Sequence, residues 1–144
     1  MPHIDRKYPF VKMADYPHMR PKDKAIWNKF IDKNPGRFAG CFYDFLVGEK
    51  DDVDAETPQN VANAWWDLTR WNIDVIAFDS QAIYIIEIKP NANAKAIGQA
   101  LAYKVLYETE HNPELPVVAV VITDIISATA KKVADRLNVE MWSV

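Results

Sequence analysis

Hydrophobic and polar positions change between a helical and a strand-like pattern along this chain. The first twenty residues contain three of the nine prolines and show little periodicity, so we expect an extended arm. Pro21 suits the first turn of a helix, and the helix dipole explains Asp23 in the same turn. The apolar positions of this helix recur at helical spacing in Ile26, Trp27, Phe30 and Ile31. Continuous apolar runs further along the chain predict buried strands.

The order of the predicted elements is αβ(α)ββαβαβ. Strands are predicted at 41–47, Ile73–Phe78, Ile83–Lys89, Val117–Thr123 and Val139–Val144, and helices at 21–33, after Pro58, at 93–110 and from the N-cap residue Ser127 to Arg136. This order predicts an α/β fold, in which α-helices flank a mixed β-sheet. We expect one domain over residues 21–144, preceded by the arm at 1–20.

Composition excludes several classes of protein. With 144 residues, of which 49% are hydrophobic, the chain suits one domain with a core. The polar N-terminal stretch lacks the apolar region of a secretory signal, and the longest aliphatic run, Val117–Ile122, is far too short to cross a bilayer. A single cysteine, Cys41, excludes an internal disulfide and fits a buried packing residue. We therefore expect a cytoplasmic protein without a membrane partner.

Three charged residues stand in the predicted hairpin, although its strands are otherwise apolar on both faces. They are Asp74, Glu87 and Lys89. Central strands normally avoid charge, because removing water from a carboxylate or an ammonium is costly unless a partner compensates for it. Whatever compensates these charges is therefore the best clue to the function.

The length of the hairpin loop decides whether the two acids meet. A loop of two or four residues pairs Phe78 with Ile83. Counting back along both strands then places Asp74 directly opposite Glu87, with their Cβ atoms about 4.5–5.5 Å apart on one face. A loop of three or five residues without a bulge would place the two acids on opposite faces. Even loops are common in hairpins, so we favour convergence.

Two interpretations fit such a pair of acids. A divalent cation such as Mg²⁺ binds one or two carboxylates and keeps several waters for substrate oxygens. Lys89, on the same face as Glu87, would then stabilise an oxyanion or orient a water. Alternatively, Glu87 and Lys89 form an ion pair at a strand end, and Asp74 caps a turn. The spacing alone leaves both interpretations open.

The hairpin and the helix after it resemble the PD-(D/E)xK nuclease superfamily. "ID" at 73–74 followed by "EIK" at 87–89 looks like its catalytic core, in which Asp, Glu and Lys come from adjacent strands. Ile73 replaces the usual Pro of the family. "QALAY" at 99–103 is similar to the QxxxY element of the RecB-like branch. The resemblance covers most of residues 20–144 and implies a restriction-endonuclease-like core.

The resemblance also implies roles for individual residues. Asp74 and Glu87 would bind Mg²⁺ or Mn²⁺ together with the backbone carbonyl of Ile88. Lys89 would assist the attacking water. A third acid often comes from upstream in this superfamily, and Asp44, in an otherwise apolar strand, is the first candidate for this further ligand.

The helix at 93–110 supplies the remaining candidates. Gln99 and Tyr103 lie on one helix face and would hydrogen-bond a carboxylate, a metal-bound water or a phosphate. Lys95 and Lys104 belong to a stretch without acids between 88 and 107, and we expect them to contact DNA phosphates. Elsewhere, three tryptophans could stack on bases, although we expect core packing for at least two of them: Trp65, Trp66 and Trp71.

A metal-dependent nuclease that hydrolyses the phosphodiester bonds of DNA is the function that the resemblance implies. Many such proteins are viral, transposon-borne or repair nucleases, and a phage source would place this one in the host cytoplasm. The alternative is a catalytically silent protein on the same fold, acting as a DNA-binding or viral assembly component. The intact Asp74, Glu87 and Lys89 argue against it, since a structural role requires none of them. The oligomeric state is open, with a homodimer among the alternatives.

Overall fold

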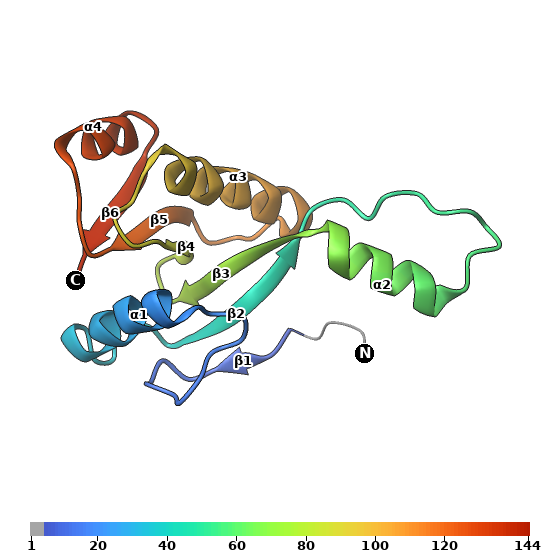
Figure 1. The fold of residues 1–144 in the computed structure, drawn as a ribbon, viewed down its shortest axis with the longest axis horizontal. Helices are drawn as coiled ribbons and strands as arrows, with labels where there is room; N and C mark the ends of the chain where they lie inside the picture. Colours follow the sequence, from blue (N-terminus) through green and yellow to red (C-terminus); the bar gives the residue numbers. More distant parts are fainter. Residues whose placement is uncertain (1–4) are drawn as a thin grey trace.

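The computed structural model describes residues 5–144, so the first four residues of the predicted arm lie outside the described part. Figure 1 shows the elements of this part in chain order. They are β1 (Lys7–Tyr8), α1 (Pro21–Lys33), β2 (Gly40–Val47), α2 (Gln59–Thr69), β3 (Trp71–Phe78), β4 (Ile83–Ile88), α3 (Ala94–His111), β5 (Val117–Thr123), α4 (Ala128–Arg136) and β6 (Val139–Ser143). Across the described residues, none of the helices has the length and apolar character that crossing a membrane requires.

The strands form one six-stranded sheet in which spatial order equals chain order, from β1 to β6. Neighbours are antiparallel from β1 to β4, whereas β4, β5 and β6 run parallel. A parallel pair needs a crossover connection, and α3 and α4 supply the two crossovers. The predicted α/β fold with a mixed sheet flanked by helices is thereby confirmed.

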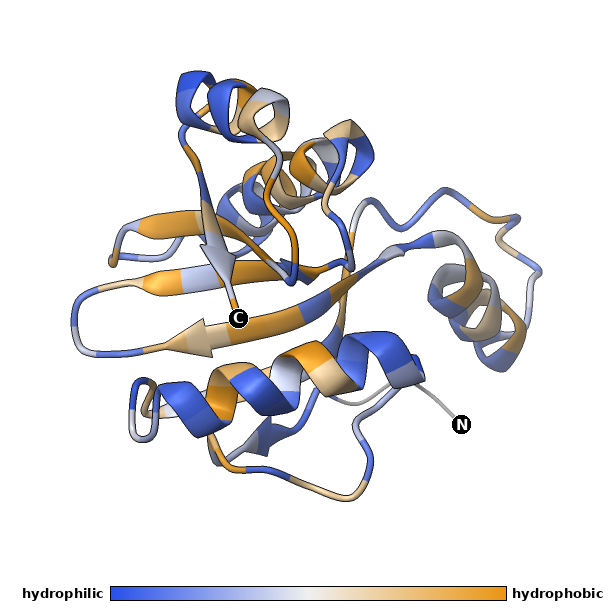
Figure 2. Ribbon diagram, turned by 60° about the vertical axis from the view of Figure 1, so that its left-hand side comes forward, coloured by the Kyte–Doolittle hydropathy of each residue, from blue (hydrophilic) through white to orange (hydrophobic). Residues whose placement is uncertain are grey.

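Helices cover both faces of the sheet. Figure 1 shows α1 on one side and α3 and α4 on the other. On the first face, Trp27 and Phe30 of α1 are buried together with Val75, Ile86 and Val120 of the central strands. On the second face, the buried residues are mostly small, and alanines of α3 and α4 pack against β5. The strands are accordingly the most uniformly hydrophobic part of the ribbon in Figure 2.

The segment before α1 is more than the predicted extended arm. Its strand β1 pairs with β2 and forms one edge of the sheet. Phe10 and Tyr16 are buried in the same core cluster as Trp27, and the rings of Phe10 and Trp27 lie 5.6 Å apart at their centroids. The Tyr16 hydroxyl donates a hydrogen bond to Asn28 Oδ1 at 2.6 Å. This segment therefore helps to hold α1 on the sheet.

Helix α2 stands away from the sheet at the ends of β2 and β3, as Figure 1 shows. Ala62 is its one fully buried residue. Trp65 of α2 is 50% exposed, Trp71 at the start of β3 is 55% exposed, and Trp66 is half-buried. The expectation that at least two of these tryptophans pack in the core is therefore wrong, because α2 does not lie on a face of the sheet.

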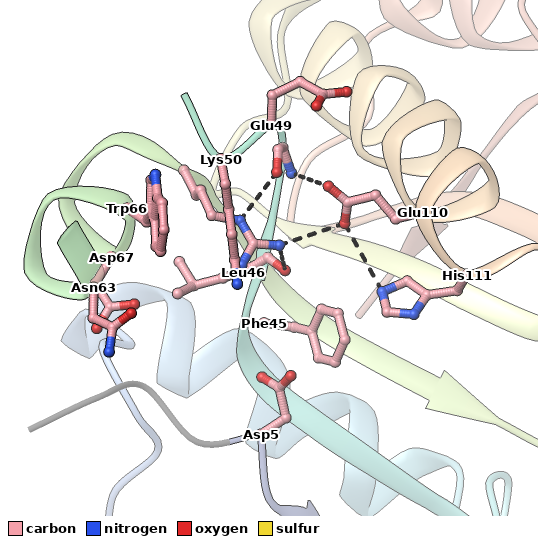
Figure 3. A pocket seen from close by; sticks show the side chains of 12 residues that line it. Asp5, Phe45, Leu46, Glu49, Lys50, Asn63, Trp66, Asp67, Glu110 and His111 are labelled. Atoms are coloured by element: carbon pink, nitrogen blue, oxygen red, sulfur yellow. Dashed lines mark hydrogen bonds and ion pairs between the residues drawn. The ribbon is translucent and has the colours of Figure 1, made fainter. Parts of the chain in front are cut away.

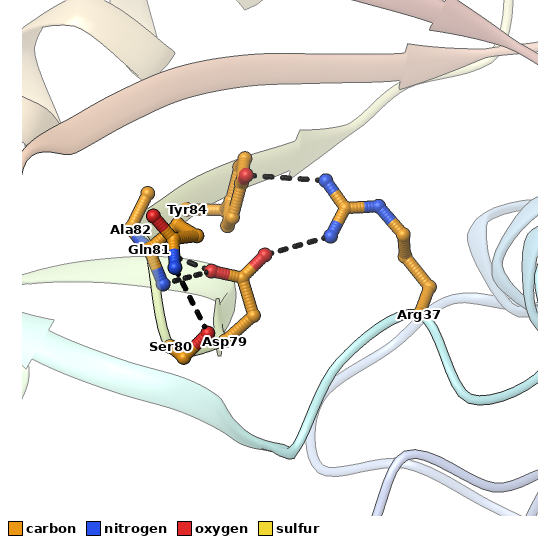
Figure 4. A network of polar contacts seen from close by, with 6 residues as sticks. All are labelled: Arg37, Asp79, Ser80, Gln81, Ala82 and Tyr84. Atoms are coloured by element: carbon orange, nitrogen blue, oxygen red, sulfur yellow. Dashed lines mark hydrogen bonds and ion pairs between the residues drawn. The ribbon is translucent and has the colours of Figure 1, made fainter.

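The turn between β3 and β4 sets the register of the hairpin (Figure 4). The Asp79 carboxylate accepts hydrogen bonds from the N–H groups of Gln81 at 2.7 Å and Ala82 at 2.9 Å. Arg37 donates to Asp79 at 2.8 Å and to the Tyr84 hydroxyl at 3.1 Å. The resulting four-residue loop pairs Phe78 with Ile83, as predicted.

Candidate active site

Asp74 and Glu87 meet at the end of the β3–β4 ladder. The last pair of the ladder is Val75 with Ile86, so the next position on each strand places Asp74 opposite Glu87. Asp74 Oδ2 accepts a hydrogen bond from the backbone N–H of Ile88 at 2.9 Å. The convergence that an even hairpin loop predicts is therefore present.

Strand β2 is distorted on the other side of Asp74. Tyr43 and Phe45 both pair with β3, but the pair between them, which would join Asp44 to Asp74, is missing from the ladder. Asp44 has a φ of 52°, in the left-handed region that few non-glycine residues adopt. Tyr43 packs in the cluster around α1, whereas Phe45 packs in a different one. The distortion thus changes which face of β2 carries its apolar side chains, at the level of the site.

The two carboxylates have little to compensate their charge. Glu87 is only 7% exposed, and its Oε2 atom has no hydrogen-bond partner among the described residues. Burial and the neighbouring Asp74 raise the pKa of Glu87 to about 9. Burial also raises the pKa of Asp74 to about 6, although the hydrogen bond from Ile88 opposes the shift. The site therefore holds negative charge poorly without a cation.

A divalent cation fits this donor set. A buried carboxylate oxygen without a partner is free to bind one, and Mg²⁺ is commonly held by one or two carboxylates and several waters. Over residues 5–144, no three His, Cys, Asp or Glu side chains form a group that could hold a metal ion. The donors that match a cation here are therefore the carboxylates of Asp74 and Glu87.

Asp44, the predicted third acid, is close to the pair but has other partners. Its Oδ1 atom accepts a hydrogen bond from Asn72 at 2.7 Å, and its Oδ2 atom lies 3.3 Å from His18 Nε2. Its charge is one cause of the raised pKa of Asp74. Asp44 therefore lies near the site, but its carboxylate oxygens contact Asn72 and His18 rather than Asp74 and Glu87.

Asp23 of α1 also reaches the site, which the helix dipole alone does not explain. It is half-buried, and burial raises its pKa while the charge of Lys89 lowers it. Its own charge contributes to the raised pKa values of Asp74 and Glu87. The sequence feature that could have indicated this is the position of Asp23 on the buried side of α1, one turn before Trp27.

An open cleft of about 820 Å³ lies over these acids. Its lining residues come from the segment before α1, the start of α1, the hairpin and α3: His18, Arg20, Pro21, Lys22, Asp23, Asp74, Glu87, Ile88, Lys89, Pro90, Lys95 and Gln99. Lys89 is half-buried in this lining and lowers the pKa of Glu87, but the described residues show no ion pair between the two. Since Asp79 rather than Asp74 caps the turn, the interpretation as a strand-end ion pair and turn cap does not describe this site.

Helix α3 brings part of the predicted QxxxY face to the cleft. Asn93 caps the helix, because its side chain accepts a hydrogen bond from Ala96 N at 3.1 Å. Lys95 and Gln99 line the cleft. Lys104 is not among the residues that line this cleft.

Tyr103 is buried below this face. Burial, followed by the charges of Glu87 and Asp74, raises its pKa to about 12, and a hydrogen bond with Gln99 acts in the opposite direction. Its hydroxyl is therefore protonated over the physiological range and lies within electrostatic reach of both acids.

A second cavity, of about 630 Å³, lies between the end of β2, α2 and the end of α3 (Figure 3). Here Glu110 accepts a hydrogen bond from Gly48 N at 2.6 Å and lies 3.5 Å from Arg70. Arg70 also donates to the carbonyls of Gly48 at 3.0 Å and Leu46 at 3.3 Å. Because these charged groups satisfy one another, they anchor α2 and are poorly suited to chemistry.

Solved structures with a similar fold include repair endonucleases. Protein-family models and curated proteins give no match to this sequence. The crystal structure of a repair endonuclease from Pyrococcus abyssi is 16% identical with a TM-score of 0.51, over 92% of this chain and 49% of that one. The structure of an EndoMS-dsDNA2 complex is 15% identical with a TM-score of 0.51, over 92% of this chain and 49% of that one.

A third similar structure is that of a protein of unknown function. It is 18% identical with a TM-score of 0.52, over 83% of this chain and 55% of that one. This chain therefore spans about half the length of the solved chains that it matches. At these identities the likeness is one of fold.

Proposed function

We propose that this chain is a metal-dependent nuclease of the PD-(D/E)xK superfamily, which hydrolyses the phosphodiester bonds of DNA. The observation that carries the proposal is the buried Oε2 atom of Glu87, which has no hydrogen-bond partner in the described chain and lies beside Asp74 under an open cleft. Two acids buried in this way destabilise the metal-free protein, because burial opposes the ionisation of both and the charge of Asp74 further opposes that of Glu87. A bound cation would compensate both charges.

Asp74, Glu87 and the carbonyl of Ile88 would hold Mg²⁺ or Mn²⁺. When bound, such an ion polarises a phosphoryl oxygen and lowers the pKa of a water molecule. The protein must release the proton of Glu87 before both carboxylates can serve as ligands. The raised pKa of Glu87 therefore favours metal binding at higher pH.

The other side chains of the cleft would position the reactants. Lys89 is half-buried and lines the same cleft, where its ammonium would orient the attacking water or stabilise a negatively charged phosphate oxygen. Gln99 would hold a phosphate or a water at the rim, and Tyr103 supports it from below through its protonated hydroxyl. This pair of residues supports the placement in the RecB-like branch.

DNA is the substrate class that these features support. Lys95 at the rim offers a positive charge to a phosphate, and α3 has no acid between residues 94 and 107. The similar folds include repair endonucleases and an EndoMS structure in complex with dsDNA.

Incubation with linear, circular and single-stranded DNA in Mg²⁺, Mn²⁺ or EDTA tests the proposal. We expect nicking or degradation with either metal ion and none in EDTA. Lys89→Ala should lose this activity and still bind Mn²⁺, because Lys89 is not proposed as a ligand. DNA binding without cleavage under all metal conditions would favour the catalytically silent alternative, a DNA-binding or viral assembly component.

A further inference from the structure

A hollow of about 440 Å³ adjoins the cleft along α3. It is lined by Trp71, Lys95, Gly98, Gln99, Ala102 and Tyr103. Lys95 and Gln99 line both spaces, so the hollow continues the cleft in which Asp74 and Glu87 lie. Its volume falls within the range of about 300–1,000 Å³ that is typical of small-molecule sites.

The indole of Trp71 forms one wall of this hollow. It is 55% exposed, and it begins β3 only three residues before Asp74. The ring of Tyr103 meets it at an interplanar angle of 65° with 6.2 Å between centroids, which supports the indole from the protein side. A large aromatic surface that is supported and still open to solvent is suited to stacking with a planar ligand.

Gly98 keeps the floor of the hollow open. Glycine within a helix lowers stability relative to alanine, because its backbone is more flexible in the unfolded chain. Gly98 lacks a positive φ, and a Cβ atom added there would meet no heavy atom within 4 Å. Neither its backbone conformation nor packing within the described chain requires a glycine. A larger side chain would, however, project into the space beside Trp71.

We propose that this hollow receives an unpaired nucleobase of the DNA strand, stacked on the indole of Trp71. The inference rests on the proposed function, since the base in the hollow would lie next to a phosphate that is held over Asp74 and Glu87. Lys95 lines both the hollow and the cleft and would contact the DNA phosphate that lies between them. A base can enter only after it leaves its own helical stack, so the site favours single-stranded DNA or unpaired positions over an intact duplex.

Direct binding measurements in EDTA test this inference without cleavage. Wild type should bind a labelled single-stranded oligonucleotide more tightly than the duplex of the same sequence. Trp71→Ala should weaken single-strand binding by roughly 5- to 150-fold, the range expected for loss of one stacked base. Trp71→Phe should restore most of it. Trp65→Ala is the matched control, since Trp65 is similarly exposed but lies on α2 outside the hollow.

Gly98→Leu provides a second, independent variant. It fills the hollow without removing any contact, so it should weaken single-strand binding as Trp71→Ala does while Tm is unchanged or higher. Duplex binding should change less than about twofold in both variants. Equal losses in Trp71→Ala and Trp65→Ala, or single-strand binding that neither hollow variant alters, would overturn the inference.

The outcomes also separate this inference from the proposed function. If the wild type cleaves DNA with Mn²⁺ but shows no preference for single strands, the inference of a base-binding hollow is overturned and the proposal of nuclease activity stands. If the binding measurements follow the expected pattern but no metal ion supports cleavage, the inference of a base-binding hollow is supported and the proposal of nuclease activity is refuted.

Discussion

The carboxylate of Asp74 accepts a hydrogen bond from the backbone N–H of Ile88, with 2.9 Å between Oδ2 and N. This contact joins β3 to β4 directly after the last ladder pair and holds one acid beside the other, Glu87. The second acid has an oxygen atom that no hydrogen bond satisfies in the described chain. The hairpin therefore places both carboxylates side by side before any cation binds, and the stability of the metal-free protein should show the cost of ionising these buried acids.

The raised pKa of Glu87 predicts that the metal-free protein becomes less stable as the pH rises. Its pKa is raised to about 9 in the folded state, whereas an unfolded chain releases this proton at about 4.3. Between these values the folded protein holds more protons, so the free energy of unfolding falls by up to about 1.4 kcal/mol per pH unit. Denaturant unfolding in EDTA at about pH 5 and about pH 8 measures the change. Glu87→Gln should flatten it, and a wild type that is more stable at the higher pH would contradict it.

Asp74→Asn should stabilise the metal-free protein. The asparagine oxygen can still accept the hydrogen bond from Ile88, while the cost of the buried charge and of its repulsion by neighbouring acids, on the order of 0.5–1 kcal/mol, disappears. Metal should reverse the order, because wild type gains about 2.7 kcal/mol at a free metal concentration of 100 times Kd and the variant gains little. Thermal melts in EDTA and in Mn²⁺ compare the two proteins. Destabilisation by Asp74→Asn in EDTA, with no metal effect on wild type, would refute the site.

The two lysines of α3 should differ in their effect on DNA binding. Lys95 lines the cleft and Lys104 does not, although both belong to the stretch without acids. Lys95→Ala should therefore weaken binding and reduce the slope of log K against log salt by about one. Lys104→Ala is the matched control and should leave the slope unchanged. A slope that responds equally to both replacements would mean that the cleft does not define the DNA path.

Asp79→Ala should destabilise the hairpin that positions the site. The Asp79 carboxylate accepts two backbone hydrogen bonds in the turn and one from Arg37 (Figure 4). Their loss should cost about 1–2 kcal/mol in denaturant unfolding. Asp135→Ala removes an exposed aspartate that pairs with Lys131 on α4, and should cost less than about 0.5 kcal/mol. Equal costs would show that the turn does not depend on Asp79.

Local patterns predict the hairpin because its determinants lie close together in the sequence. Two continuous apolar runs and a four-residue loop determine the Phe78–Ile83 pair, and that register brings Asp74 to Glu87. The N-cap of α4 is equally local, and Ser127 accepts the expected hydrogen bond from Ala130 N at 3.1 Å. Such features follow from neighbouring residues alone.

Features that depend on distant segments escape the same reasoning. Strand β1 forms because it pairs with the edge of β2. It has only two residues, which is too short for a hydrophobic period to be recognised in the sequence. Asp23 enters the cleft because the start of α1 lies beside Asp74 and Glu87, and the hollow at Trp71 exists because Gly98 faces it from α3. Patterns within one element do not specify how two elements meet.

Direct titration of the protein with Mn²⁺, followed by the electron paramagnetic resonance signal of the free ion, tests the central claim that the acidic pair is a cation site. Wild type should bind Mn²⁺ more tightly as the pH rises, because Glu87 must lose its proton first. Asp74→Asn and Glu87→Gln should each abolish binding, whereas Asp44→Asn should weaken it less, since Asn72 and His18 already contact Asp44. Mn²⁺ binding that is absent in wild type, or that survives in both Asp74→Asn and Glu87→Gln, would contradict the claim.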